Sequence, residues 1–212
     1  MPEILKIDPR KPDKSLIDTA VNILKKGGII AFPTETFYGL GADAGNVEAV
    51  EKIYRIKGRN PQNPIPLIIG NTRDMTGLVE DIPEAGRKLM KKFWPGGLTI
   101  VFMASSNILP GLTGGTGKIG IRLSSNIIAS QLAKILSKPI TATSANPSGA
   151  GECISADEVI DCLKDKIDAI IDGGRTPGGL GSTIVDVTTD PVTVLRKGII
   201  PPSLLDNTPA KI

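Results

Sequence analysis

Apolar side chains recur at helical spacing in five segments of the chain, which predicts five helices. They are expected after Asp13, after Asn46, over Glu84–Phe93, over Ile127–Ser137 and after Ser155. Asp13, Asn46 and Ser155 can each cap the first turn of the helix that follows. Ser155 with Glu158, three residues on, is typical of a capping box.

Short apolar runs between these helices predict seven or eight strands. The runs are Ile29–Phe32, Pro64–Gly70, Leu98–Ala104, Ile119–Leu123, Pro139–Thr143 and Ala169–Asp172, followed by 182–188 and 192–198. The last two runs are joined through Thr189-Asp190-Pro191 and are expected to form an antiparallel hairpin. Residues 33–45 and 105–118 are expected to be loops.

The order of these elements is interleaved but irregular. Such an order is typical of an α/β or α+β fold with a twisted sheet of mixed parallel and antiparallel strands flanked by helices. The chain has no internal repeat and no linker in its interior. We therefore expect one domain over residues 1–198 and an extended tail over residues 199–212.

The chain has 212 residues and no histidine. Without an imidazole it cannot form a Ser-His-Asp triad, a Cys-His pair or a HExxH zinc helix. Its two cysteines, Cys153 and Cys162, are too few for a cysteine-only zinc site and do not suggest a secreted disulfide framework. Reactions driven by positioning and charge remain, and phosphoryl or nucleotidyl transfer leads that class.

The net charge of +3, from 25 basic and 22 acidic side chains, is too mild to indicate a nucleic-acid partner by itself. The longest apolar stretches have strand length, far below the roughly 20 residues of a membrane span. The N-terminal segment lacks the apolar core of a signal peptide. We expect a cytoplasmic protein that does not enter a membrane.

Two glycine-rich segments are near misses for nucleotide-binding motifs. Gly39–Ala44 fits G-x-G-x-x-G/A, but position 59 holds Arg where a dinucleotide site needs an acidic residue. Gly111 and Gly117-Lys118 are spaced one residue too far apart for a P-loop, and Ile119 replaces the Ser or Thr that binds magnesium. The simpler interpretation is that these glycines allow turns.

The segment PTETFYGLG presents hydroxyls and a carboxylate where the strand Ile29–Phe32 ends. Its side chains Thr34, Glu35, Thr36 and Tyr38 could line an open sheet edge, although an ordinary polar loop has the same composition. Ser144-Ala145-Asn146 also follows a strand, and ligands of open α/β sheets gather at the carboxyl ends of strands.

Basic side chains occur at three further places. Lys57 and Arg59 flank Gly58 at a helix end, which suits a polyphosphate but also describes a solvated basic helix end. Arg122 and Arg196 lie within strand patterns, where a lone Arg needs an anion or an acid as partner. The loop Gly173–Thr183 could offer backbone N–H groups to an anion.

Six segments, in order along nearly the whole chain, resemble the threonylcarbamoyl-adenylate synthase family and its YrdC-like domain. They are PTETFYGLGADA, KIYRIKGRNPQNP, WPGGLTIVF, IGIRLSSN, TATSANPSG and GSTIVDVT. The KxR and SxN signature of the family corresponds to Lys57, Arg59, Ser144 and Asn146. The resemblance implies a single YrdC-like domain with a large concave site.

The resemblance also implies a reaction. L-threonine, bicarbonate or carbon dioxide, and ATP form threonylcarbamoyl-adenylate and pyrophosphate, with Mg²⁺ as cofactor. The threonylcarbamoyl group then modifies an adenosine beside the anticodon of tRNA. We therefore expect tRNA as a partner, directly or through a separate transferase.

By motif position, the resemblance implies roles for twelve residues. Catalysis is assigned to Lys57 and Arg59; threonine binding to Thr34, Thr36, Tyr38, Arg122 and Ser182; ATP binding to Lys57, Arg59, Asn63, Lys118, Ser144, Asn146 and Arg196. No side chain is assigned as a metal ligand.

This chain departs from the family at Ile68, where many members have a histidine near the threonine site. The departure affects a polar contact with substrate rather than the reaction class. Some members also carry a second C-terminal domain over the site, and this chain is expected to be a single-domain form. The alternatives are a non-catalytic module that binds double-stranded RNA or tRNA, and a carbamoyl-adenylate enzyme of hydrogenase maturation.

Overall fold

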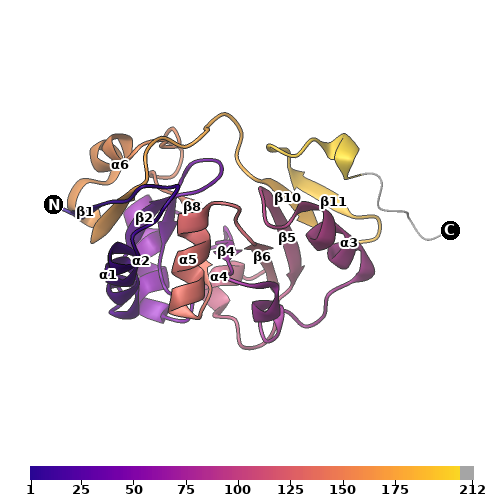
Figure 1. Ribbon diagram of the computed structural model, residues 1–212. Helices are drawn as coiled ribbons and strands as arrows, with labels where there is room; N and C mark the ends of the chain where they lie inside the picture. Colours follow the sequence, from indigo (N-terminus) through magenta and orange to yellow (C-terminus); the bar gives the residue numbers. More distant parts are fainter. Residues whose placement is uncertain (206–212) are drawn as a thin grey trace.

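Residues 1–205, the part of the chain that the computed structural model describes, form six α-helices, eleven strands and three 3₁₀ helices (Figure 1). The helices are α1 (Lys14–Lys25), α2 (Val47–Lys57), α3 (Glu84–Phe93), α4 (Pro110–Thr113), α5 (Ile127–Leu136) and α6 (Ala156–Leu163). The strands are β1 (Glu3–Lys6), β2 (Ile30–Pro33), β3 (Tyr38–Gly41), β4 (Leu67–Ile68), β5 (Leu98–Met103), β6 (Lys118–Arg122), β7 (Ile140–Thr141), β8 (Thr143–Ser144), β9 (Ala169–Asp172), β10 (Thr183–Asp186) and β11 (Thr193–Arg196). The 3₁₀ helices are η1 (Thr72–Met75), η2 (Lys164–Lys166) and η3 (Pro202–Leu204).

The strands form two mixed sheets. One has five strands in the order β1-β9-β2-β3-β8, and the other has six in the order β11-β10-β5-β6-β4-β7. Each sheet contains parallel and antiparallel pairs, such as β1 with β9 and β2 with β3 in the first. The chain passes from the six-stranded to the five-stranded sheet between β7 and β8, at Ala142.

Two apolar clusters hold these layers together. In the first, Leu24 of α1 and Leu132 of α5 pack with Phe32 against one face of the five-stranded sheet. The second and larger cluster joins the opposite face, with α2 and α6, to the six-stranded sheet and α3. Figure 1 shows α3 on the side of the six-stranded sheet and α1, α2 and α6 on the other side.

The predicted helix starts are formed as the capping pattern indicates. The side chains of Asp13, Asn46 and Ser155 each accept a backbone N–H in the first turn of α1, α2 and α6. The capping box at α6 is only half formed, which corrects that prediction. The Glu158 carboxylate accepts the N–H of Ile154 at 2.8 Å instead of that of Ser155.

The predicted α/β class, the mixed strand pairing and the hairpin of β10 and β11 are confirmed. The division into two sheets was not predicted, and β1 and β3 were not expected. Strand β3 lies within residues 33–45, which were expected to be a loop. Its two glycines, a residue type that is rare in strands, interrupt the apolar run by which a strand is predicted. Gly41 is needed there, since a Cβ at this position would lie 2.6 Å from Cε1 of Phe32.

The first residues of the predicted tail pack on the six-stranded sheet. The N–H of Ile199 donates to the Gly181 carbonyl, and Ile200 exchanges two hydrogen bonds with the Thr183 hydroxyl. Residues 202–204 form η3 rather than extended chain, and residues 206–212 of the predicted tail lie outside the described residues. In the described part of the chain, no helix combines the length and the apolar character that crossing a membrane requires.

Candidate functional site

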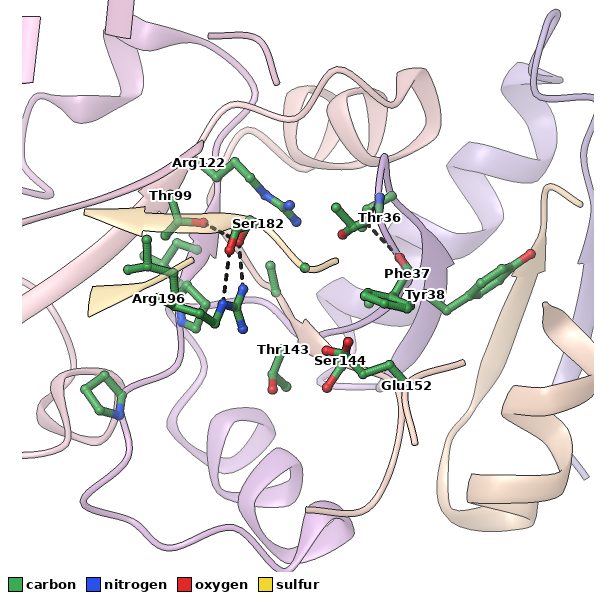
Figure 2. Close-up of a pocket in the computed structure, with 18 of the residues that line it drawn as sticks. Thr36, Phe37, Tyr38, Thr99, Arg122, Thr143, Ser144, Glu152, Ser182 and Arg196 are labelled. Atoms are coloured by element: carbon green, nitrogen blue, oxygen red, sulfur yellow. Dashed lines mark hydrogen bonds between the residues drawn. The ribbon is translucent and has the colours of Figure 1, made fainter. Parts of the chain in front are cut away.

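A polar cavity of about 180 Å³ lies between the two sheets (Figure 2). The turn after β2, the ends of β6, β8 and β11, and the residue before β10 contribute side chains to it. Its polar side chains are Thr34, Thr36, Arg59, Thr99, Arg122, Thr143, Ser144, Glu152, Ser182 and Arg196. The cavity therefore gathers hydroxyls and guanidinium groups from segments that are far apart in the sequence.

The turn between β2 and β3 builds one side of the cavity. The hydroxyls of Thr34 and Thr36 lie 3.1 Å apart, and Thr34 also donates to the Phe37 carbonyl at 2.7 Å. Both threonines are buried and line the cavity. Their hydroxyls are fixed by the turn itself, so this side of the cavity is built before any ligand arrives.

Glu35, between these threonines, forms an ion pair with Arg122 at the end of β6. Oε1 of Glu35 lies 3.0 Å from Nη1 of Arg122, and the two side chains are only 12% and 7% exposed. The Ser124 hydroxyl donates to the other carboxylate oxygen. The pair connects the two sheets, and in Figure 2 the Arg122 side chain extends toward Thr36 across the cavity.

Ser182 is held from two directions at the start of β10. Its hydroxyl lies 2.9 Å from the Thr99 hydroxyl, and Nη2 of Arg196 donates to it at 2.9 Å. Nε of Arg196 donates to the Ser182 carbonyl at 3.0 Å. Ser182, assigned to threonine, and Arg196, assigned to ATP, thus lie side by side, and Thr99 joins them.

Arg59 follows Gly58, which ends α2 in the left-handed conformation at φ 58°. Its guanidinium donates to the carbonyls of Asn63 and Pro64. Burial lowers the pKa of Arg59. Burial also lowers the pKa of Arg196; the Glu152 carboxylate opposes that shift, and the cations of Arg122 and Arg59 add to it. Three guanidinium groups therefore lie close enough to influence one another, which favours an anionic ligand.

A second cavity of about 510 Å³ shares Arg59, Thr99 and Arg196 with the first. Asn63 and Lys118 line it, as do apolar side chains from β5, β10 and β11. Lys118 is engaged by Asp186, whose Oδ2 lies 2.8 Å from Nζ. The two cavities together form one connected site with a small polar part and a larger, more apolar part.

Lys57 lies behind the wall of the cavity and is not one of the residues that line it. Its ammonium donates to the carbonyls of Ser144 and Asn146, each at 2.5 Å. Its own carbonyl accepts the N–H of Ser148. Burial lowers the pKa of Lys57 to about 8, and the Arg59 cation adds to that shift. Lys57 thus positions the loop that carries Ser144.

Asn146 is also buried behind the wall. Its Nδ2 donates to the carbonyls of Pro147 and Ala150, and its Oδ1 has no hydrogen-bond partner among the described residues. Of the four signature residues, only Arg59 and Ser144 line the cavity. Lys57 and Asn146 instead hold the loop that follows Ser144 in place through the hydrogen bonds described above.

Two residues differ in orientation from the sequence interpretation. The Tyr38 ring is fully buried and points away from the cavity in Figure 2, and its hydroxyl donates to the Gly174 carbonyl at 2.7 Å. Burial raises the pKa of Tyr38. This hydroxyl is therefore engaged inside the protein, and the contact of Tyr38 with threonine stays a prediction. Ile68 lies in the apolar cluster of α1 and α5, whereas its neighbour Leu67 lines the cavity.

Several side chains at the site received no role from the motif positions, among them Glu35, Phe37, Thr99, Thr143 and Glu152. Glu35 stood in the polar segment already singled out, and its burial beside Arg122 could not be read from that segment. Thr99 sits in an apolar strand, and Glu152 in a loop of no distinct pattern. Only the tertiary structure brings them to the cavity.

Within residues 1–205 no three or more Cys, Asp or Glu side chains are grouped as a metal ion would require. The carboxylates that line the two cavities are Glu152 in the first and Asp186 in the second. A metal ion that arrives with a phosphate ligand needs only one or two protein carboxylates. The residues present fit an ion of that kind, and of these two carboxylates Asp186 is in an ion pair with Lys118, whereas Glu152 forms no ion pair with the described residues.

Comparison with known proteins places these features in context. The model of the Sua5, YciO and YrdC proteins, described as "Telomere recombination", matches residues 22–198. The threonylcarbamoyl-AMP synthase of Pyrococcus abyssi is 40% identical over 185 residues, covering 87% of this chain and 54% of that protein. The synthase of Bacillus subtilis is 39% identical over 183 residues, covering 86% and 53%.

A solved structure, P. abyssi Sua5 complexed with L-threonine, superposes with a TM-score of 0.93 at 37% identity. The superposition covers 96% of this chain and 59% of that one. The chain thus spans about half the length of the two curated relatives it matches.

Proposed function

The chain belongs to the Sua5/YciO/YrdC family, and on that premise we propose that it is a threonylcarbamoyl-AMP synthase. It condenses L-threonine, bicarbonate or carbon dioxide, and ATP to threonylcarbamoyl-AMP and pyrophosphate, which makes it a nucleotidyltransferase. The product supplies the threonylcarbamoyl group for the modification of tRNA beside the anticodon. Two relatives are named for this synthase, and a related structure contains L-threonine.

One observation carries the proposal. Ten of the twelve residues that the resemblance assigns to substrates, all except Lys57 and Asn146, line the two connected cavities. Tyr38 is one of these ten, and it is the one whose hydroxyl is turned away. The small polar cavity suits an amino acid, and the larger one suits a nucleotide. The three arginines of the site suit the charges of a carboxylate and a triphosphate.

Arg122 binds the threonine carboxylate in this mechanism. A guanidinium has five N–H donors in a planar fork, so the contact with Glu35 leaves donors for a second carboxylate. Thr36 and Ser182 offer hydroxyls to the rest of the amino acid. The substrate is thereby held with its amine free to react.

The neutral amine of threonine attacks the carbon of bicarbonate or carbon dioxide and forms a carbamate. When carbon dioxide is the reactant, the amine releases a proton; when bicarbonate is the reactant, that proton leaves together with the hydroxyl group of bicarbonate as water. A carbamate oxygen then attacks the α-phosphorus of ATP, and the bond from that phosphorus to the pyrophosphate oxygen breaks. Arg59 and Arg196 stabilise the charge on the leaving pyrophosphate, which is the main demand of phosphoryl transfer.

Mg²⁺ supplies further charge neutralisation when it is bound with the nucleotide. Glu152 is the residue that would hold it. Lys57 acts indirectly: it donates to the backbone carbonyls on either side of Ala145 and so keeps Ser144 at the cavity. We assign Lys57 as a positioning residue and Arg59 as a catalytic residue.

A pyrophosphate assay tests the proposal. The protein is incubated with ATP, Mg²⁺ and bicarbonate, and pyrophosphate is measured with and without L-threonine. We expect release that depends on threonine. Equal release in both samples would contradict the synthase and would favour the alternative of a non-catalytic RNA-binding module. That alternative predicts tRNA binding that weakens steeply with salt and is indifferent to ATP.

A further inference from the structure

Glu152 is an exposed residue whose carboxylate lines the first cavity and makes no hydrogen bond or ion pair with the described residues. It lies in the loop between β8 and α6, and Figure 2 shows its side chain beside Ser144. Among the residues that the structure describes, Glu152 accepts no hydrogen bond and forms no ion pair. By contrast, Asp186 in the second cavity is paired with Lys118, and Glu35 is paired with Arg122.

The free carboxylate stands among groups that suit phosphate. Arg59, Ser144 and Arg196 line the same cavity and have been assigned to ATP. A carboxylate in that position repels a triphosphate unless a cation lies between the two anions. The Arg196 cation lies near enough to attract the Glu152 carboxylate, because that carboxylate opposes the lowering of the Arg196 pKa by burial. No ion pair joins the two side chains, however, since Arg196 donates to Ser182 and Arg59 donates to the Asn63 and Pro64 carbonyls, so the position between Glu152 and a phosphate is open to a further cation.

The donor set matches a hard divalent cation. Mg²⁺ prefers oxygen ligands, keeps several waters, and is commonly bound by one or two carboxylates together with substrate phosphates. The hydroxyls of Thr143 and Ser144 line the cavity on the side of Glu152 and add oxygen atoms. We propose that Glu152 is the side chain through which this protein binds the magnesium ion of its nucleotide.

This inference rests on the proposed function, because it takes ATP as the ligand of the arginines. A rival role for the same carboxylate is to hold the ammonium group of threonine. The two roles differ in what they change. A magnesium ligand alters how ATP binding depends on the metal, whereas an ammonium partner alters the binding of threonine.

The test measures ATP binding by calorimetry, with Mg²⁺ and with EDTA in its place. In the wild type we expect Mg²⁺ to strengthen ATP binding. In Glu152→Gln we expect that gain in affinity to be lost, so that Mg-ATP binds at least about tenfold more weakly than to the wild type. Metal-free ATP should bind as well as or better than to the wild type, because the repulsion between the carboxylate and the triphosphate is removed. Glu152→Asp should keep part of the gain. Glu51→Gln, the same change on the exposed side of α2, should behave as wild type.

A direct metal readout complements the calorimetry. With Mn²⁺ in place of Mg²⁺, wild-type protein and ATP should give an electron paramagnetic resonance spectrum that differs from that of Mn-ATP alone. With Glu152→Gln, the spectrum should be that of unbound Mn-ATP. An unchanged magnesium gain in Glu152→Gln would overturn the inference. So would equal weakening with and without metal, which indicates a structural role, or a loss confined to threonine binding.

The outcomes also separate this inference from the proposed function. Threonine-dependent pyrophosphate release together with an unaltered metal dependence in Glu152→Gln overturns only the role of Glu152. Metal-dependent ATP binding without threonine-dependent turnover overturns only the synthase. A wild-type protein that binds no ATP overturns both.

Discussion

The cavity has two sides whose charges are satisfied in different ways. On the paired side, Arg122 and Glu35 neutralise each other at 3.0 Å, both nearly buried, and Ser124 donates to the same carboxylate. On the open side, Arg59 and Arg196 donate only to uncharged groups, and Glu152 forms no hydrogen bond or ion pair with the described residues. One side is complete in the protein alone, and the other lacks its counter-charges.

The difference indicates how each side is used. The paired side is preorganised, so it can select a small ligand by shape and hydrogen bonding before that ligand binds. The open side has charges that a polyphosphate and its metal ion would complete. We therefore expect changes on the paired side to affect folding together with activity, and changes on the open side to affect activity alone.

Arg122→Ala should produce the largest effect. It leaves the Glu35 carboxylate buried without its cation, and breaking a buried pair in this way costs about 3–5 kcal/mol of stability. It also removes the proposed threonine-carboxylate contact. We expect a fall of that size in the free energy of unfolding, measured in denaturant, and loss of threonine binding.

A double variant separates these two losses. Replacing both Glu35 and Arg122 by Met removes the unpaired charge along with the pair, and such exchanges are often neutral for stability. The double variant should therefore be more stable than Arg122→Ala and equally inactive. If Arg122→Ala unfolds at the wild-type denaturant concentration, the paired side contributes nothing to the fold and the comparison fails.

Arg59→Ala should affect activity without affecting the fold. The side chain is partly exposed and makes no ion pair with the described residues, so we expect stability within about 0.5 kcal/mol of wild type. Loss of an arginine that stabilises phosphoryl-transfer charge lowers kcat by about 10³-fold or more. Pyrophosphate release measures the first quantity and denaturation the second. Turnover near the wild-type rate would mean that ATP does not bind at Arg59.

Most of the fold could be predicted from local pattern. The boundaries of α3, the caps of α1, α2 and α6, and the hairpin of β10 and β11 all follow from apolar spacing and capping residues. The division into two sheets could not be predicted, because it depends on which strands pair. The predicted strand Pro139–Thr143 shows this, since it contains β7 and the first residue of β8, which lie in different sheets.

The site could be predicted less completely. Motif positions identified the residues that surround the cavity, but a motif does not say which way a side chain points. Lys57 and Tyr38 belong to the matching segments, yet both side chains are turned into the protein. Conversely, Thr99 and Glu152 line the cavity through tertiary packing alone.

Lys57 offers a test that depends on pH. Burial lowers its pKa in the folded protein from 10.5 to about 8, so between these pH values the unfolded chain binds more protons than the folded one. The contribution of Lys57 to the free energy of unfolding therefore rises with pH between about pH 8 and 10.5, by up to about 1.4 kcal/mol per pH unit. Below that range the contribution does not change with pH. The free energy of unfolding of wild type relative to Lys57→Met should increase by about 2 kcal/mol from pH 7.5 to 9.5. A constant difference between the two proteins would show that Lys57 titrates as it does in the unfolded chain.

Thr99→Val should have the smallest effect, at the point where the two sides meet. Thr99 is buried and its hydroxyl lies 2.9 Å from that of Ser182, which Arg196 holds from the open side. The variant keeps the shape and removes one hydrogen bond, worth about 0.5–1.5 kcal/mol, while Arg196 keeps Ser182 near its place. We expect the KM for threonine to rise by about 2- to 10-fold with kcat unchanged, because only ground-state binding of the amino acid is weakened. Thr99→Ser retains the hydroxyl and should restore the wild-type KM. A fall in kcat with an unchanged KM would instead place Ser182 with the nucleotide, and the boundary between the two sides would have to be moved.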